Sequence, residues 1–122
     1  MIRFECDYAE GAAPQLLERL TRTNLEQTPG YAVDGHCQRA RDLIRAACAA
    51  PQAEVEFLVG GTQANQTVIS AALRPYQGAL CAQTGHINVH ETGAIEATGH
   101  KVLAVPAENG KLTARAVEEE CR

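Results

Sequence analysis

The sequence predicts an α/β fold in which a mostly parallel sheet is flanked by helices. Two observations support this class. Short apolar runs, several of them β-branched, alternate along the chain with segments of helical periodicity. The 122 residues, 45% hydrophobic and 21% charged, have the composition of a globular chain and suffice for one domain or part of one.

The first third of the chain is predicted to be a short extended start at residues 2–6, a helix and a loop. Pro14 can open a helix, and the apolar spacing after it suits one helix face, at Leu16, Leu17 and Leu20. Residues 24–35 contain glycine, proline and aspartate with little periodicity, which is typical of a loop. This loop is a candidate functional element.

The middle of the chain is predicted to be helix, strand, glycine turn and helix. Residues 36–50 have helical period with charged outer positions, and Pro51 ends that helix. Residues 55–59 form a β-branched and aromatic run that stops at Gly60-Gly61, and residues 62–73 return to helical spacing. A predicted strand therefore turns into a helix at two glycines.

The last third is predicted to hold two more strands and two more helices. Residues 79–82 and 101–105 are short apolar runs, with a short helix expected at residues 91–98 between them. A turn follows at residues 108–111, and Thr113 can cap a final helix through residue 120.

Composition and charge argue against several classes of protein. The formal net charge of −4 opposes nucleic-acid binding, which needs a basic face. Apolar runs are too short for a membrane-spanning helix, and the start has no signal-peptide pattern, so a cytoplasmic location without membrane or nucleic-acid partners is expected. The five scattered cysteines contain no CxxC pair and are expected to be buried thiols rather than disulfide or zinc ligands.

The turn at residues 58–65 is the strongest candidate for a binding site. Glycines let the backbone approach an anion, and a helix start offers free N–H donors, to which Thr62 adds a hydroxyl. The turn matches neither a Walker loop nor the GxGxxG dinucleotide pattern, which favours phosphate without nucleotide. The alternative is an ordinary glycine turn with Thr62 as the helix N-cap.

A histidine directly after a predicted strand is the second candidate. His86 and His90 are four residues apart with Glu91 adjacent, which raises the possibility of a metal site. The order differs from HExxH, where the glutamate follows the first histidine, and no metal is expected. The other alternative is a histidine that only satisfies local hydrogen bonds.

These motifs resemble those of low-specificity threonine aldolases and related β-eliminating lyases, in order and in spacing. The resemblance rests on residues 60–65 (GGTQAN), 84–88 (TGHIN) and 91–94 (ETGA) and extends over nearly the whole chain. It implies the N-terminal part of the large domain of a fold-type I pyridoxal-phosphate enzyme. Residues 1–35 would be an arm, helix and active-site loop, and residues 36–122 a partial cofactor-binding domain.

The resemblance also implies roles for individual residues. The positions of Gly61, Thr62 and Gln63 would bind pyridoxal 5'-phosphate, and His86 would stack on its ring and act in catalysis. Two further positions, Cys6 and Tyr31, would contact the substrate. The family usually has serine where this chain has Cys6 and Gly60, and the loop around Tyr31 also differs, which bears on specificity.

The function implied is aldol cleavage or β-elimination of a β-hydroxy or related amino acid, in a homo-oligomer. In that family a lysine binds the cofactor covalently. This chain has only Lys101 and Lys111, neither in the family's lysine context, so the chain alone is expected to be inactive. The alternatives are a non-catalytic phosphate- or partner-binding module and a truncated domain with an exposed core.

Overall fold

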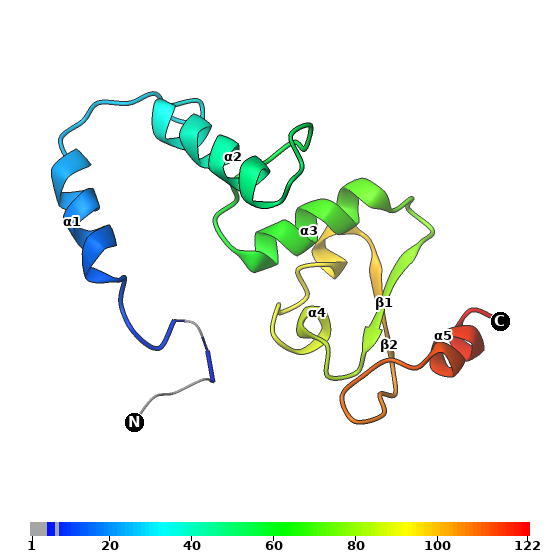
Figure 1. Cartoon of the computed structure of the whole chain (residues 1–122). Coiled ribbons are helices and arrows are strands. Elements are labelled where there is room, and N and C mark those ends of the chain that lie inside the picture. The colour runs from blue at the N-terminus through cyan, green and yellow to red at the C-terminus, as the bar shows by residue number, and fades with distance from the viewer. Residues whose placement is uncertain (1–4, 7) are drawn as a thin grey trace. The chain divides into compact units, whose positions relative to one another are not determined.

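A computed structural model of the chain describes residues 5–6 and 8–122 (Figure 1). Its contacts divide the chain into two compact units, Met1–Glu56 and Phe57–Arg122. The functional boundary expected between residues 35 and 36 is a different division, and it stays a prediction. Most of the extended start expected at residues 2–6 lies outside the described residues.

The first unit contains two helices, α1 (Pro14–Thr23) and α2 (Gly35–Ala47). Both were predicted, and α1 begins at the proline, whose ring suits the first turn. The carboxylate of Asp34 caps α2 by accepting from the backbone N–H groups of His36 at 2.8 Å and Cys37 at 3.0 Å. α2 ends before the expected residue 50, because Ala49 adopts a left-handed φ of 50°.

Two arginines of α2 form hydrogen bonds with the backbone before and after the helix. Arg41 donates through Nε to the carbonyl of Val55 at 3.0 Å and through Nη1 to that of Ala32 at 2.7 Å. Arg45, one turn further, donates through Nε to the carbonyl of Ala53 at 2.8 Å. Since both arginines lie on α2, their hydrogen bonds attach the flanking loops to this helix.

The second unit contains a parallel pair of strands, β1 (Gly78–Ala82) and β2 (Lys101–Val105) (Figure 1). Helix α3 (Gly61–Ala72) precedes the pair, α4 (His86–Val89) and the 3₁₀ helix η1 (Glu96–Thr98) connect the two strands, and α5 (Ala114–Glu120) follows. Thr113 caps α5 as predicted, accepting from the N–H of Ala116. The predicted α/β class and parallel pairing are confirmed.

Two predicted elements of this part of the chain were wrong. Residues 55–59 form no strand in the described chain, because the ladder of β1 and β2 offers them no pairing and the division between the units falls inside the run. The helix expected at 91–98 reduces to the 3₁₀ turn Glu96–Thr98, since Thr92 and Gly93 have left-handed φ values of 50° and 77°.

A small apolar core holds the second unit together. Cys81 of β1, Val102 of β2 and Ile95 of the connection are buried, and Ile95 is completely inaccessible. Ile69 of α3 and Ile87 of α4 pack against this cluster, so both helices are attached to the sheet. Burial raises the pKa of the Cys81 thiol, with a smaller contribution from the charge of Glu96, which keeps the thiol protonated.

The expectation of buried thiols is correct only for Cys81, because the other four cysteines lie outside this core. Cys6 and Cys37 are half-buried, and Cys48 and Cys121 are exposed.

Candidate functional site

The start of α3 presents unpaired hydrogen-bond donors. The helix begins at Gly61 with Gly60 as its cap residue, so there is no side-chain cap. Among the described residues, the N–H groups of Gly61, Thr62 and Gln63 have no acceptor, and the hydroxyl of Thr62 has no partner. Thr62 lies inside the helix, so the alternative that it is the N-cap was wrong. This donor set suits an anion.

The two glycines at this helix start border open space. A Cβ added to either Gly60 or Gly61 would have no heavy atom within 4 Å. Neither has a positive φ, so the backbone does not require glycine there. Packing and backbone geometry therefore leave these glycines unexplained, and the open space beside them would admit a ligand close to the backbone.

Gly85, which precedes His86, is glycine for a different reason. A Cβ at Gly85 would lie 2.8 Å from the carbonyl oxygen of Ala82 and 3.2 Å from Cβ of Cys81. The chain therefore turns tightly against the end of β1 before α4 begins. This turn places His86 directly beyond the carboxyl end of β1, the end of a parallel strand where ligands bind in open α/β sheets.

His86 is joined by hydrogen bonds to a buried glutamate and, through it, to α3. The Nδ1 atom of His86 lies 2.7 Å from Oε1 of Glu91, and Nδ2 of Asn65 donates to the same oxygen at 2.6 Å. The Glu91 side chain is completely buried, whereas that of His86 is 64% exposed. The imidazole is thus fixed on one side and open to a ligand on the other.

The second carboxylate oxygen of Glu91 has no partner among the described residues. Its Oε2 atom is buried and forms no hydrogen bond. An unpaired buried carboxylate oxygen is costly, because the water lost on burial is not replaced by a donor. Thr92 follows with a φ of 50°, an unfavourable value for a β-branched residue. An unpaired buried oxygen at Glu91 and an unfavourable backbone conformation at Thr92 therefore occur together near His86.

Of the remaining predicted site residues, one lies at the donor site and two lie in the other unit. Gln63 is at the start of α3, and its Oε1 accepts from the N–H of Val59 at 2.9 Å, which fixes the turn before the helix. Cys6 and Tyr31 belong to the first unit, where Tyr31 is fully exposed and has a φ of 60°. Their roles in substrate binding stay predictions.

The pair His86 and His90 does not form the centre of a larger ligand set. The two rings lie 5.3 Å apart between centroids and are tilted by 51°. Within the described ranges, no group of three or more histidine, cysteine, aspartate or glutamate side chains is arranged to hold a metal ion. Nor does any helix of the described chain have the length and apolar character to cross a membrane.

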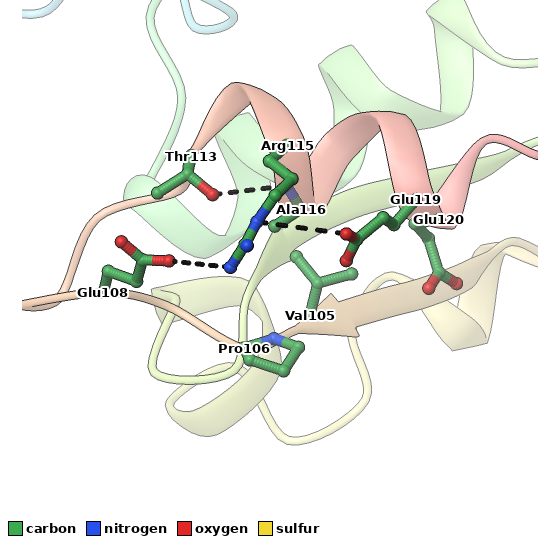
Figure 2. Close-up of a pocket in the computed structure, with 8 residues that line it drawn as sticks. All are labelled: Val105, Pro106, Glu108, Thr113, Arg115, Ala116, Glu119 and Glu120. Atoms are coloured by element: carbon green, nitrogen blue, oxygen red, sulfur yellow. Dashed lines mark hydrogen bonds and ion pairs between the residues drawn. The ribbon is translucent and has the colours of Figure 1, made fainter.

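A pocket of about 320 Å³ lies beyond the carboxyl end of β2, between that strand and α5 (Figure 2). Arg115 crosses it between Glu108, at 3.4 Å, and Glu119, at 3.9 Å. None of the predicted site residues lines it; the lining consists of Val105, Pro106, Glu108, Thr113, Arg115, Ala116, Glu119 and Glu120. The donors at α3 and the imidazole of His86, which this pocket does not include, therefore make the better candidate.

Asn65 and Glu91 are site residues whose roles the sequence did not reveal. Both lie within motifs that carry the family resemblance, but Glu91 was considered only as a metal ligand. One signal was available, because Asn65 is four residues after Gly61 and so shares its helix face. The contact between Asn65 and Glu91, 26 residues apart, was not readable from the sequence.

Comparisons with known proteins show which family the chain resembles over its length. The model of the Beta-eliminating lyase family matches residues 5–122. Low specificity L-threonine aldolases of Pseudomonas sp. (strain NCIMB 10558) and Pseudomonas aeruginosa are 30% and 29% identical to the chain over 119 residues, which is 96% of this chain. The chain spans about a third of the length of these relatives, 34% in each case.

A solved structure of Leishmania major threonine aldolase has the same fold. It superposes with a TM-score of 0.87 at 46% identity and covers 93% of this chain and 33% of its own. The fold predicted from the resemblance, that of the large domain of such an enzyme, is confirmed by this superposition. With a family model that matches all but the first four residues, the chain belongs to the beta-eliminating lyase family.

Proposed function

We propose that this chain holds the phosphate and ring of pyridoxal 5'-phosphate in a lyase of threonine aldolase type, which cleaves a β-hydroxy or related amino acid. One observation carries the proposal. The unpaired donors at the start of α3 and the exposed imidazole of His86 are connected through Asn65 and Glu91, so an anion site and a ring site belong to one structure.

The start of α3 would hold the phosphate. Its N–H groups and the Thr62 hydroxyl are donors without acceptors in the described chain, and the helix dipole favours a dianion there. Gly60 and Gly61 leave the approach open, since a Cβ at either would meet nothing within 4 Å. These residues fit a phosphate group in donor chemistry and in space.

His86 would contact the ring of the cofactor. Its side chain is largely exposed while Nδ1 is fixed by Glu91, so one ring face and Nε2 are accessible. In this role the imidazole stacks on the pyridine ring, and Nε2 holds or moves a proton at the substrate. The cofactor, when bound, supplies the electron sink for bond cleavage at the amino acid.

The proposal assigns the covalent lysine to neither Lys101 nor Lys111. The register supports this for Lys101, which pairs with Gly78 at the amino end of the sheet. His86 follows Ala82 at the carboxyl end, roughly 13 Å away at about 3.3 Å per strand residue. We further propose that Cys6 and Tyr31 contact the amino-acid substrate, and that the complete enzyme is a cytoplasmic homo-oligomer.

Calorimetric titration with pyridoxine 5'-phosphate tests the phosphate site without involving lysine chemistry, because this analogue lacks the aldehyde. Thr62→Val keeps the shape of the side chain and removes the hydroxyl donor. We expect the affinity to fall on the order of tenfold, the value of one hydrogen bond to a charged group. Pyridoxine, which has no phosphate, should bind at least about tenfold more weakly than its phosphate ester.

Thr67→Val is the matched control, because Thr67 is an exposed residue of the same helix, away from its start. It should leave the affinity unchanged. Equal binding of pyridoxine and its phosphate ester, equal effects of the two threonine variants, or no binding at all would each contradict the proposal. Inorganic phosphate binding as tightly as the ester would contradict it too, in favour of a non-catalytic phosphate-binding module.

A further inference from the structure

We propose that Glu91 is a positioning residue of this site, which sets the tautomer of His86 and fixes the imidazole to the helix that starts at Gly61. The inference deepens the proposed function and rests on it for the nature of the ligand. The geometry of the three side chains does not depend on any ligand.

The hydrogen bond between His86 and Glu91 determines which ring nitrogen carries the proton. A carboxylate only accepts hydrogen bonds, so the Nδ1 atom at 2.7 Å from Oε1 of Glu91 must carry the proton in the neutral ring. Nε2 then has the lone pair. Since Nε2 has no partner among the described residues, it is the nitrogen that can accept a proton at the open face.

Glu91 is also connected to α3. Asn65 donates to the same Oε1 atom at 2.6 Å, and it follows Gly61 by four residues, about one helical turn. The carboxylate therefore bridges an α3 side chain and the imidazole of α4. A ligand with a phosphate at the start of α3 and a ring against His86 would find both parts at a defined separation.

This arrangement is unfavourable for the stability of the fold. The Glu91 side chain has no exposed surface and its Oε2 atom has no hydrogen bond, so the acid is unfavourable for folding at this place. A glutamine or an apolar residue would fill the same volume without leaving a buried charged oxygen unpaired. A residue that violates packing rules in this way is typical of a functional site.

The tautomer of His86 is measured by long-range ¹H–¹⁵N NMR of the chain labelled at histidine. The spectrum is taken at about pH 8.5, two units above the ordinary histidine pKa of about 6.5, where neutral rings dominate. We expect His86 to favour the Nδ1–H form on the order of tenfold or more over the Nε2–H form. His90, whose ring forms no hydrogen bond in the described chain, is the internal reference and should show a mixture.

Two substitutions test the cause. Glu91→Met removes the acceptor at similar volume, and the His86 ratio should fall to that of His90. Glu91→Gln keeps an acceptor oxygen without the charge and should give an intermediate ratio, which also covers the case that the methionine variant does not fold. Glu96→Met, at an exposed glutamate of η1, is the control and should leave the ratio unchanged.

A wild-type His86 ratio equal to that of His90, or one that Glu91→Met and Glu91→Gln leave unchanged, would overturn the inference. The affinity for pyridoxine 5'-phosphate gives an independent reading. It should fall several-fold in Glu91→Met, while affinity for inorganic phosphate stays the same. If the Glu91 variants lose the tautomer preference of the wild type, but Thr62→Val does not change the affinity for pyridoxine 5'-phosphate, the inference is retained and the proposed function is rejected.

Discussion

The two units of this chain are held together by different interactions. The second unit has a buried apolar core around Ile95, and all buried residues of the described chain, Cys81, Glu91, Ile95, His100, Val102 and Val105, belong to it. The first unit has no buried residue in either helix, and the polar contacts of Asp34, Arg41 and Arg45 connect its segments. Precise placement of a ring or a phosphate needs a packed apolar core such as that of the second unit.

This difference agrees with the residues that each unit carries. His86, Glu91 and the donors of α3 are attached to the core through Ile69 and Ile87. Tyr31, on the other hand, has a fully exposed side chain, and its turn is held by the hydrogen bond of Arg41 to the carbonyl of Ala32 and by a long backbone bond from Val33 to Gly30. We therefore expect the two units to respond separately to substitutions, and unit-specific measurements can break or sharpen this contrast.

The largest effect is expected for Ile95→Ala. Ile95 is the one side chain with no exposed surface among the buried apolar residues of the described chain, and its truncation leaves a cavity in the core. We expect the free energy of unfolding of the second unit to fall by about 3 kcal/mol. Native-state hydrogen exchange should show this loss at β1 and β2, while Leu20→Ala, at a leucine that is 62% exposed, should leave both strands unaffected.

A smaller effect, confined to the first unit, is expected for Arg41→Met. The substitution keeps most of the side-chain volume but removes the donors to the carbonyls of Val55 and Ala32. At about 1 kcal/mol for each hydrogen bond, protection of the α2 amides should fall by about 2 kcal/mol. Arg39→Met, at an exposed arginine of the same helix, serves as the control. An equal loss at β1 and β2 would show that the units are not independent.

The smallest effect concerns the pH dependence of α2. The thiol and backbone N–H of Cys37, with that of His36, donate to Asp34 and lower its pKa from 3.8 to about 2. Because the folded pKa lies below the ordinary value, the stabilisation is complete above pH 3.8 and is lost as the pH falls through about 2.

The amide shifts of His36 and Cys37 report this transition in an NMR titration. In Asp34→Asn the cap remains but cannot titrate, so the acid transition of the two amides should disappear. An unchanged transition in this variant would mean that another group controls the start of α2. Amides of β1 should not respond to the substitution in either case.

Much of the fold could be predicted from local patterns. Pro14, Asp34 and Thr113 each lie at or next to a helix start, and residues 101–105 were predicted as a strand with the bounds that β2 has. These elements follow from side chains and their immediate neighbours along the chain. The strand expected at residues 55–59 failed, since a strand requires a partner that no local pattern supplies.

The candidate site divides along the same line. The sequence by itself determined that an anion could bind at Gly60, Gly61 and Thr62, because glycines before a helix expose backbone donors whatever surrounds them. Only the tertiary structure decided that Asn65 and Glu91 fix His86 beside that helix. Helix starts are local, whereas a buried carboxylate acquires its partners from segments that meet only when the sheet and helices pack.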